Sequence, residues 1–122
     1  MTEVTLNDGL QKIEDNAFCD CESLESIILP STVTEIGMYT FFDCSNLSEV
    51  TLNEGLQKIG NRVFDGCASL QTITLPSTVV EIGDNAFFDC RNLSEVALNE
   101  GMQKIGDNAF INCLSLESIT IP

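Results

Sequence analysis

The sequence predicts an α/β repeat fold. We expect a solenoid in which 23-residue units stack as rungs, with a parallel β-sheet on one side and short helical or 3-10 turns on the other. Two observations predict it. Several apolar columns recur every 23 residues along the whole chain, and apolar and polar residues alternate at the start of each unit, which is the period of a strand. The columns include Cys21, Cys44, Cys67, Cys90 and Cys113; Phe18, Phe41, Phe64, Phe87 and Phe110; and Ile13, Ile36, Ile59, Ile82 and Ile105.

Each unit begins with an expected short strand of the pattern LxxIxL. Residues 24–29 (LESIIL) show it, because Leu24, Ile27 and Leu29 belong to apolar columns. Asn or Pro follows this stretch in every unit, which ends the strand and starts a turn. One unit cannot bury its apolar face alone. We therefore expect the units to stack in register, with parallel strands about 4.8 Å apart.

The second half of each unit is expected to hold a turn and then one short helical turn. A glycine follows the isoleucine column, where we expect a positive φ. These glycines are Gly37, Gly60, Gly83 and Gly106. Asp15, Asp84 and Asp107 precede the sequence Asn-Ala-Phe and are expected to cap the N-terminus of the helical turn. That turn would carry the phenylalanine and cysteine columns into the core.

Composition narrows the class of function. The 122 residues include 19 acidic and five basic side chains, so the formal net charge is −14, and there is no His. The charge argues against binding to nucleic acid or insertion at an anionic membrane, since both need Lys and Arg. Without His, the commonest general base and neutral metal ligand are missing. The opening residues MTEVTLNDGL have no feature of a signal peptide.

The repeat resembles the leucine-rich repeat of the BspA-like class. The shared pattern is LxxIxLPxxVxxIGxxAFxxCxx, and residues 24–46 and 70–92 match it best. The resemblance implies a right-handed solenoid whose parallel sheet lies on the concave side. Many members of that family are cell-surface or secreted proteins that bind other proteins or mediate adhesion. The resemblance therefore implies protein binding and a surface or secreted location.

The whole chain is expected to form one solenoid over residues 1–122. Its repeats are 1–23, 24–46, 47–69, 70–92 and 93–115, with a partial repeat 116–122. Odd repeats carry N-[D/E]-G-[L/M]-Q-K-I where even repeats carry P-S-T-V-[T/V]-E-I, so the repeating unit is a pair of 46 residues. Residues 46–60 and 92–106 differ at two positions, which favours recent duplication or an engineered array.

Neither end of the array carries a polar capping repeat. A terminal repeat without a cap exposes core surface and an unpaired strand edge. We therefore expect the chain to be a fragment of a longer array, and we expect end-to-end contact between copies through residues 1–6 or 116–121.

The cysteines are expected to be core residues. Their 23-residue spacing matches no zinc motif, and Cys19-x-Cys21 is the only close pair. Free cysteine suits a small apolar core position. Stacked thiols would run parallel and not toward one another, which disfavours disulfides. Cys19 lies outside the column and is expected to be an exposed thiol. Because the spacing of the cysteines matches no metal site, we expect neither a metal nor a cofactor.

All three lysines lie in one column, where they alternate with glutamates. We expect Lys–Glu pairs between adjacent rungs, each stabilising the fold by about 0.2–1 kcal/mol. A slip by one rung would bring like charges together and is disfavoured. The column is Lys12, Glu35, Lys58, Glu81 and Lys104.

The strand carboxylates do not indicate an enzyme. Glu3, Glu49 and Glu95 recur on every second rung, so they should lie about 9–10 Å apart. That spacing is too wide for one Ca²⁺ site, whose oxygens lie about 2.3–2.6 Å from the ion. It only touches the upper end of the range for an inverting glycosidase pair, and nothing in the sequence predicts a pocket around it. We expect no catalytic residue.

The outward residues of the strands, on the expected concave side, form the predicted partner-binding surface, named the strand face. It comprises Glu3, Thr5, Ser26, Ile28, Glu49, Thr51, Thr72, Thr74, Glu95, Ala97, Ser118 and Thr120. It offers carboxylates and hydroxyls without a basic residue, so we expect a protein partner with a basic surface. It lacks Tyr, Trp and Arg, which predicts weak binding. The alternative is a structural spacer segment with no partner of its own.

Overall fold

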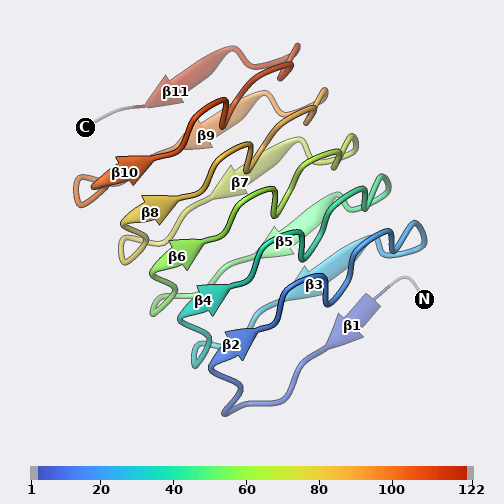
Figure 1. Cartoon of the computed structure of the whole chain (residues 1–122), viewed down its shortest axis with the longest axis vertical. Coiled ribbons are helices and arrows are strands. Elements are labelled where there is room, and N and C mark those ends of the chain that lie inside the picture. The colour runs from blue at the N-terminus through green and yellow to red at the C-terminus, as the bar shows by residue number, and fades with distance from the viewer. Residues whose placement is uncertain (1–2, 121–122) are drawn as a thin grey trace.

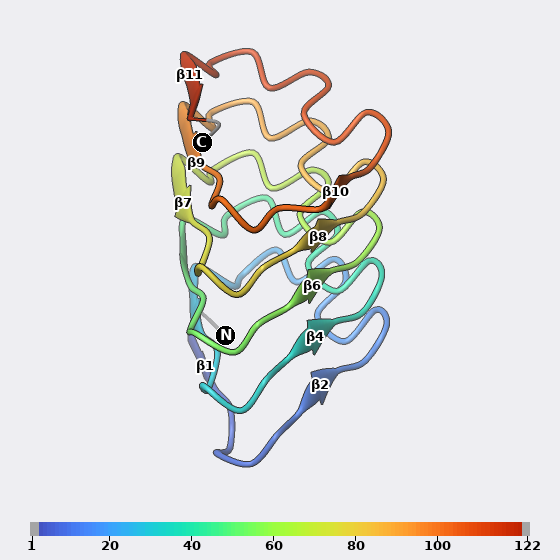
Figure 2. The ribbon, with the colours of Figure 1, turned by 90° about the vertical axis from the view of Figure 1, so that its left-hand side faces the viewer.

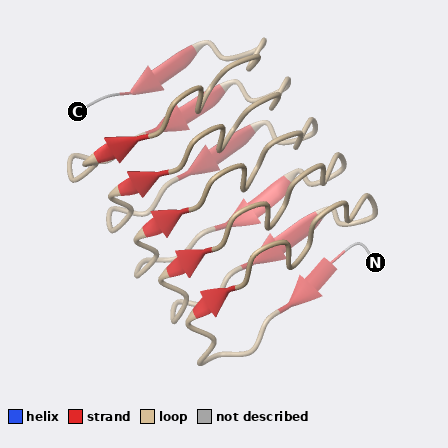
Figure 3. Cartoon of the chain, viewed as in Figure 1, coloured by secondary structure: helices blue, strands red, loops and turns tan. Residues whose placement is uncertain are grey.

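The chain coils into a stack of rungs built from short strands and turns (Figure 1). The computed structural model describes residues 3–120, and within them no helix forms (Figure 3). The three-residue strands are β1 (Glu3–Thr5), β3 (Ser26–Ile28), β5 (Glu49–Thr51), β7 (Thr72–Thr74), β9 (Glu95–Ala97) and β11 (Ser118–Thr120). The two-residue strands are β2 (Lys12–Ile13), β4 (Glu35–Ile36), β6 (Lys58–Ile59), β8 (Glu81–Ile82) and β10 (Lys104–Ile105).

All strand pairs are parallel, and each joins equivalent residues 23 positions apart. Glu3 pairs with Ser26, and Lys12 pairs with Glu35. The two-residue strands form one five-stranded sheet in the order β10-β8-β6-β4-β2. The three-residue strands lie on the other side of the rungs (Figure 2). Parallel stacking in register confirms the prediction, while the five-stranded sheet was not predicted.

We predicted that the three-residue strands form one continuous sheet. They form two sheets instead. One has the order β1-β3-β5 and the other the order β11-β9-β7. At the junctions on either side, the backbone N–H of Ser48 donates to Glu25 O and that of Ser94 donates to Gln71 O, both at 2.9 Å. Among the described residues, the equivalent bond from Gln71 to Ser48 O is missing. The sheet is therefore split between β5 and β7.

The predicted helical turns are wrong, since tight non-helical turns take their place. Asn16 and Asp20 both have a φ of 60°, and their equivalents in later rungs also lie in the left-handed region. Two such residues, four positions apart, interrupt a right-handed helix. The turn amides instead bond to the next rung, as Phe18 N does to Thr40 O at 2.9 Å. Bonds between rungs therefore replace bonds within a helix.

The glycines after the isoleucine column do not have the predicted positive φ. Positive φ among the glycines occurs at Gly9, Gly55 and Gly66. Gly60 is required by close approach of the neighbouring rung: a Cβ there would lie 2.8 Å from Ile36 O. At Gly83 the same atom would lie 2.6 Å from the Asn61 backbone nitrogen. These glycines let successive rungs pass within contact distance of one another.

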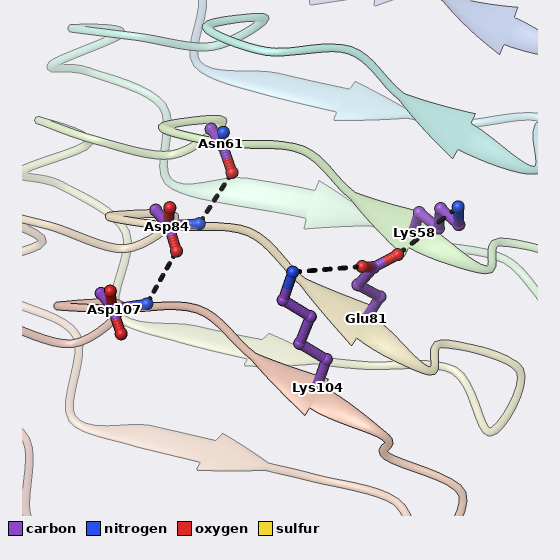
Figure 4. Close-up of polar contacts among 6 residues, drawn as sticks. All are labelled: Lys58, Asn61, Glu81, Asp84, Lys104 and Asp107. Carbon is purple, nitrogen blue, oxygen red and sulfur yellow. Dashed lines mark hydrogen bonds and ion pairs between the residues drawn. The ribbon is translucent and has the colours of Figure 1, made fainter.

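The predicted N-caps serve the neighbouring rung and not a helix of their own. Asp15 Oδ1 accepts the backbone N–H of Met38 at 2.9 Å. Asp84 Oδ1 accepts that of Asp107 at 2.8 Å (Figure 4). The cap prediction for Asp15, Asp84 and Asp107 is wrong because no helix follows them. The Asp15 and Asp84 side chains do accept a backbone N–H, as a cap would, but that N–H belongs to the next rung.

The core is a set of continuous side-chain columns. Phe18, Phe41, Phe64, Phe87 and Phe110 stack with ring centroids 5.3–5.6 Å apart and interplanar angles of 3–12°. Cys44, Cys67 and Cys90 are buried, as predicted, and Cys21 and Cys113 on the outer rungs are half-buried. The Cys67 thiol donates to Phe41 O at 3.2 Å. The cysteine column therefore satisfies backbone carbonyls in the core.

Candidate functional site

The strand face is placed as the alternation predicted. Its residues are the first and third residues of the three-residue strands, and the middle residue of each strand lies toward the core. Ile27, Ile73 and Val96 are at most 4% exposed. Glu3, Ile28, Glu49, Thr51, Thr72, Thr74, Glu95 and Ala97 are exposed, and Ser26 is half-buried. The backbones of Thr5, Ser118 and Thr120 lie in β1 and β11.

The register keeps the carboxylates of the strand face apart. Ser26 lies between Glu3 and Glu49, and Glu95 lies between Thr72 and Ser118. Like charges therefore do not occupy adjacent strands, where they would repel. No Lys or Arg lies on these strands within the described residues. The face offers a partner spaced negative charges and hydroxyl groups.

The lysine and glutamate column lies on the five-stranded sheet and pairs in the predicted register. Glu81 receives Lys58 Nζ at 3.5 Å and Lys104 Nζ at 3.8 Å (Figure 4). The expected pairs of Glu35 do not form ion pairs within 4.0 Å among the described residues, although Lys12 and Lys58 flank it in the sheet. The register prediction is confirmed, and only half of the expected ion pairs form.

A shallow hollow of about 330 Å³ lies beside this column. Its floor includes Gly37, Gly60 and Gly83, and Lys58 and Glu81 stand on one wall. Glu81 pairs with Lys58 and Lys104, and the lining also includes Asp15, Glu35 and Asp84, so carboxylates outnumber lysines around the hollow. No group of three or more acidic or Cys side chains within residues 3–120 is arranged to hold a metal ion.

Burial raises the pKa of four cysteines of the core column, which are Cys44, Cys67, Cys90 and Cys113. Burial raises the pKa of Cys44 to about 12 and that of Cys113 to about 11. Cys19 is half-buried, where we expected it to be exposed, and its thiol donates to Asp20 Oδ2 at 3.6 Å. Burial raises the pKa of the Cys19 thiol, and the neighbouring Asp20 carboxylate raises it further. Because the thiolate is the reactive form, these environments make a redox or nucleophilic role unfavourable.

One buried carboxylate was missed in the sequence. Asp65 is 5% exposed and accepts a 2.8 Å ion pair from Arg62, three residues earlier. Burial raises its pKa, and Arg62 acts in the opposite direction. The signal was available, because Asp65 is the one charged residue in a column otherwise made of Cys19, Phe42, Phe88 and Ile111. The pair lies in a turn, away from the strand face.

Within residues 3–120, no helix has the length and apolar character that crossing a membrane requires. The sequence matches the family described as BspA type Leucine rich repeat region, in six copies over residues 1–122. Among curated proteins, no sequence matches the chain significantly.

Solved structures of other leucine-rich repeat proteins are similar to this one. A leucine-rich repeat protein of T. pallidum is 36% identical, with a TM-score of 0.91 over 95% of this chain and 55% of its own. A leucine rich cell surface protein of Faecalibacterium prausnitzii is 32% identical, with a TM-score of 0.93 over 98% and 31%. A leucine-rich repeat protein of Bacteroides ovatus is 33% identical, with a TM-score of 0.88 over 99% and 33%.

The chain thus spans between about a third and about half of the length of these proteins. Nearly all residues of the chain align with repeats of these three proteins and adopt the same fold. The chain belongs to the BspA-type leucine-rich repeat family.

Proposed function

We propose that the chain is a non-enzymatic protein-binding module and that its strand face contacts a protein with a basic surface. The observation that carries the proposal is the character of this face. It is exposed, its carboxylates are spaced by hydroxyl side chains, and its described strands hold no basic residue. Complementary charge raises the association rate and excludes partners of the same sign.

The comparisons support an interaction role and a location outside the cell. One similar structure is described as a leucine rich cell surface protein. We include cell adhesion in the proposal on the same ground. The exposed Ile28, which is 60% exposed in the middle of the β1-β3-β5 sheet, adds an apolar contact to an otherwise polar face.

A selection from a displayed peptide library, with the chain as bait, tests the proposal. Selected peptides should be enriched in Lys and Arg. The double variant Glu49→Lys, Glu95→Lys should lose their binding, as measured by calorimetry. The matched control is Glu54→Lys, Glu100→Lys, which makes the same charge change at the strand-to-turn corner and should retain most of the binding. Equal losses in both variants would refute a role for the strand face and favour the spacer alternative.

End-to-end self-association is a second proposal, carried by a different observation. Ile105 is 43% exposed and Leu114 is 75% exposed, whereas Ile82, one rung before Ile105, is 0% exposed. Of the segments expected to make the contact, residues 1–2 and 121 lie outside the described residues. Light scattering over a concentration series should show association that Leu114→Glu weakens. A monomer at millimolar concentration would contradict it.

A further inference from the structure

The split between β5 and β7 opens the strand face at its middle. On the other side of the same two rungs the ladder is intact, since Gly83 N bonds to Ile59 O at 2.8 Å and Val80 N bonds to Gln57 O at 2.9 Å. The two rungs therefore separate only at the strand face, like a wedge. The opening arises inside the array and not at either end.

The wedge leaves a hollow of about 340 Å³ in the strand face. It is lined by Ser48, Glu49, Val50, Thr51, Leu52, Thr72, Ile73 and Thr74. Its floor is apolar and includes Val50 and Leu52. These two side chains are half-buried, whereas the equivalent Ile27 and Leu29, one rung earlier, are only 1% exposed. Its rim is polar, with the Glu49 carboxylate and threonine hydroxyls exposed. Such a hollow fits a group with an apolar stem and a polar head.

The width of the split decides between two kinds of occupant. An inserted strand would hold β5 and β7 about 9.6 Å apart, which is two strand spacings. Yet Cα atoms of β5 and β7 still lie within 8 Å of one another. The opening is therefore too narrow for a strand. The occupant to consider is therefore a single side chain that approaches from the solvent.

Charge selects the side chain. Glu49 is the acidic group at the rim, and the lining includes no basic residue. Lys and Arg combine an aliphatic stem, which can cover Val50 and Ile73, with a cationic head that can reach a carboxylate. We propose that the hollow between β5 and β7 is the anchor point of the strand face, and that it takes one Lys or Arg side chain of a protein partner. This proposal rests on the proposed function of the strand face.

Chemical-shift titration tests the assignment on the isotope-labelled chain. The probe is the peptide acetyl-Gly-Ser-Arg-Ser-Gly-amide, and the control peptide carries neutral citrulline in place of Arg. The Arg peptide should shift the amide signals of residues 48–52 and 72–74. The citrulline peptide should shift them much less. Shifts spread evenly over all acidic residues, or equal effects of the two peptides, would overturn the proposal.

Matched variants separate local recognition from the overall negative charge. Glu49→Gln and Glu95→Gln remove the same charge from the same column, but Glu95 lies on β9, inside a paired sheet. Glu49→Gln should weaken binding of the Arg peptide at least threefold more than Glu95→Gln. Equal weakening would refute the anchor point. If equal weakening accompanied loss of library peptides in the double lysine variant, the strand-face function would stand without it.

Discussion

Thr78 Oγ1 accepts a 3.0 Å hydrogen bond from the backbone N–H of Gly55, one rung earlier. The same hydroxyl donates to Leu56 O at 2.6 Å. Thr32 makes the equivalent pair of bonds to Gly9 and Leu10. Each even rung thus attaches to the preceding odd rung through a threonine. Asn53 and Asn99 make the return connection, since the amide of Asn53 donates to Leu29 O and that of Asn99 to Pro76 O.

The threonine connection predicts the effect of Thr78→Val. Valine keeps the shape but leaves the Gly55 N–H and the Leu56 carbonyl without their partner in a partly buried site. Stability should fall by about 1–3 kcal/mol. Thr34→Val is the control, because Thr34 makes a single long bond, 3.4 Å to Gln11 O, at an exposed position. Urea unfolding measures both, and equal losses would contradict the connection's importance.

A second prediction concerns the gap in the Asp and Asn column. Asp15, Asn61 and Asp84 each accept the backbone N–H of the next rung, but Met38 in the same column has no oxygen for Asn61. Met38 is also 42% exposed. Met38→Asn should therefore stabilise the chain by about 0.5–1.5 kcal/mol.

Met38→Leu is the matched control for that gain, since it changes the side chain without supplying an acceptor. Thermal or urea unfolding gives the comparison. If the asparagine variant were no more stable than the leucine variant, the column would contribute nothing at this position.

Stacking and register could be predicted because one period controls both. A column such as Phe18 to Phe110 has one solution in which every ring is covered, and that solution also fixes the pairing of Lys12 with Glu35. The strand face followed from the same register. A one-residue shift would have exposed Ile27 and buried Ser26.

The turns could not be predicted because each local signal has two physical explanations. Glycine permits a positive φ and also permits close approach. Only the short distance that a Cβ at Gly60 would have to Ile36 O shows that the second applies. An Asp side chain can accept an N–H of its own helix or of the next rung, and Asp84 does the latter. The split at Gln71 has no sequence signal, because its rungs carry the same pattern as the others.

A third prediction concerns alkaline pH. Burial raises the pKa of Cys44 from its ordinary value of 9.0 to about 12. Between these values the folded chain holds a proton that the unfolded chain releases, so stability falls as pH rises from 9 toward 12 and is fully retained below 9. Urea midpoints in reducing buffer should decline over that window.

Burial also raises the pKa of other core thiols, among them Cys90 and Cys113, so a variant must isolate the contribution of Cys44. Cys44→Ala lowers stability at pH 7 but removes this proton linkage. Its urea midpoint should therefore decline less steeply above pH 9 than that of the unmodified chain. Parallel declines would show that burial of Cys44 does not control the alkaline loss.

The split sheet makes a fourth prediction, for hydrogen exchange. The amides of Ser48, Ser94 and Glu117 bond to the preceding rung at 2.9–3.0 Å, whereas the equivalent amide of Gln71 has no such bond among the described residues. A hydrogen bond that must open before exchange slows the reaction. Gln71 should therefore exchange faster than Ser48 and Ser94, which lie on either side of it in the same column, and Ser48 is exposed as Gln71 is. Residue-resolved NMR exchange provides the rates, and the Lys58 and Lys104 amides on the five-stranded sheet serve as a second reference for protection by pairing. Equal protection of Gln71, Ser48 and Ser94 would mean that β5 and β7 pair in solution, and it would close the hollow proposed to hold a basic side chain.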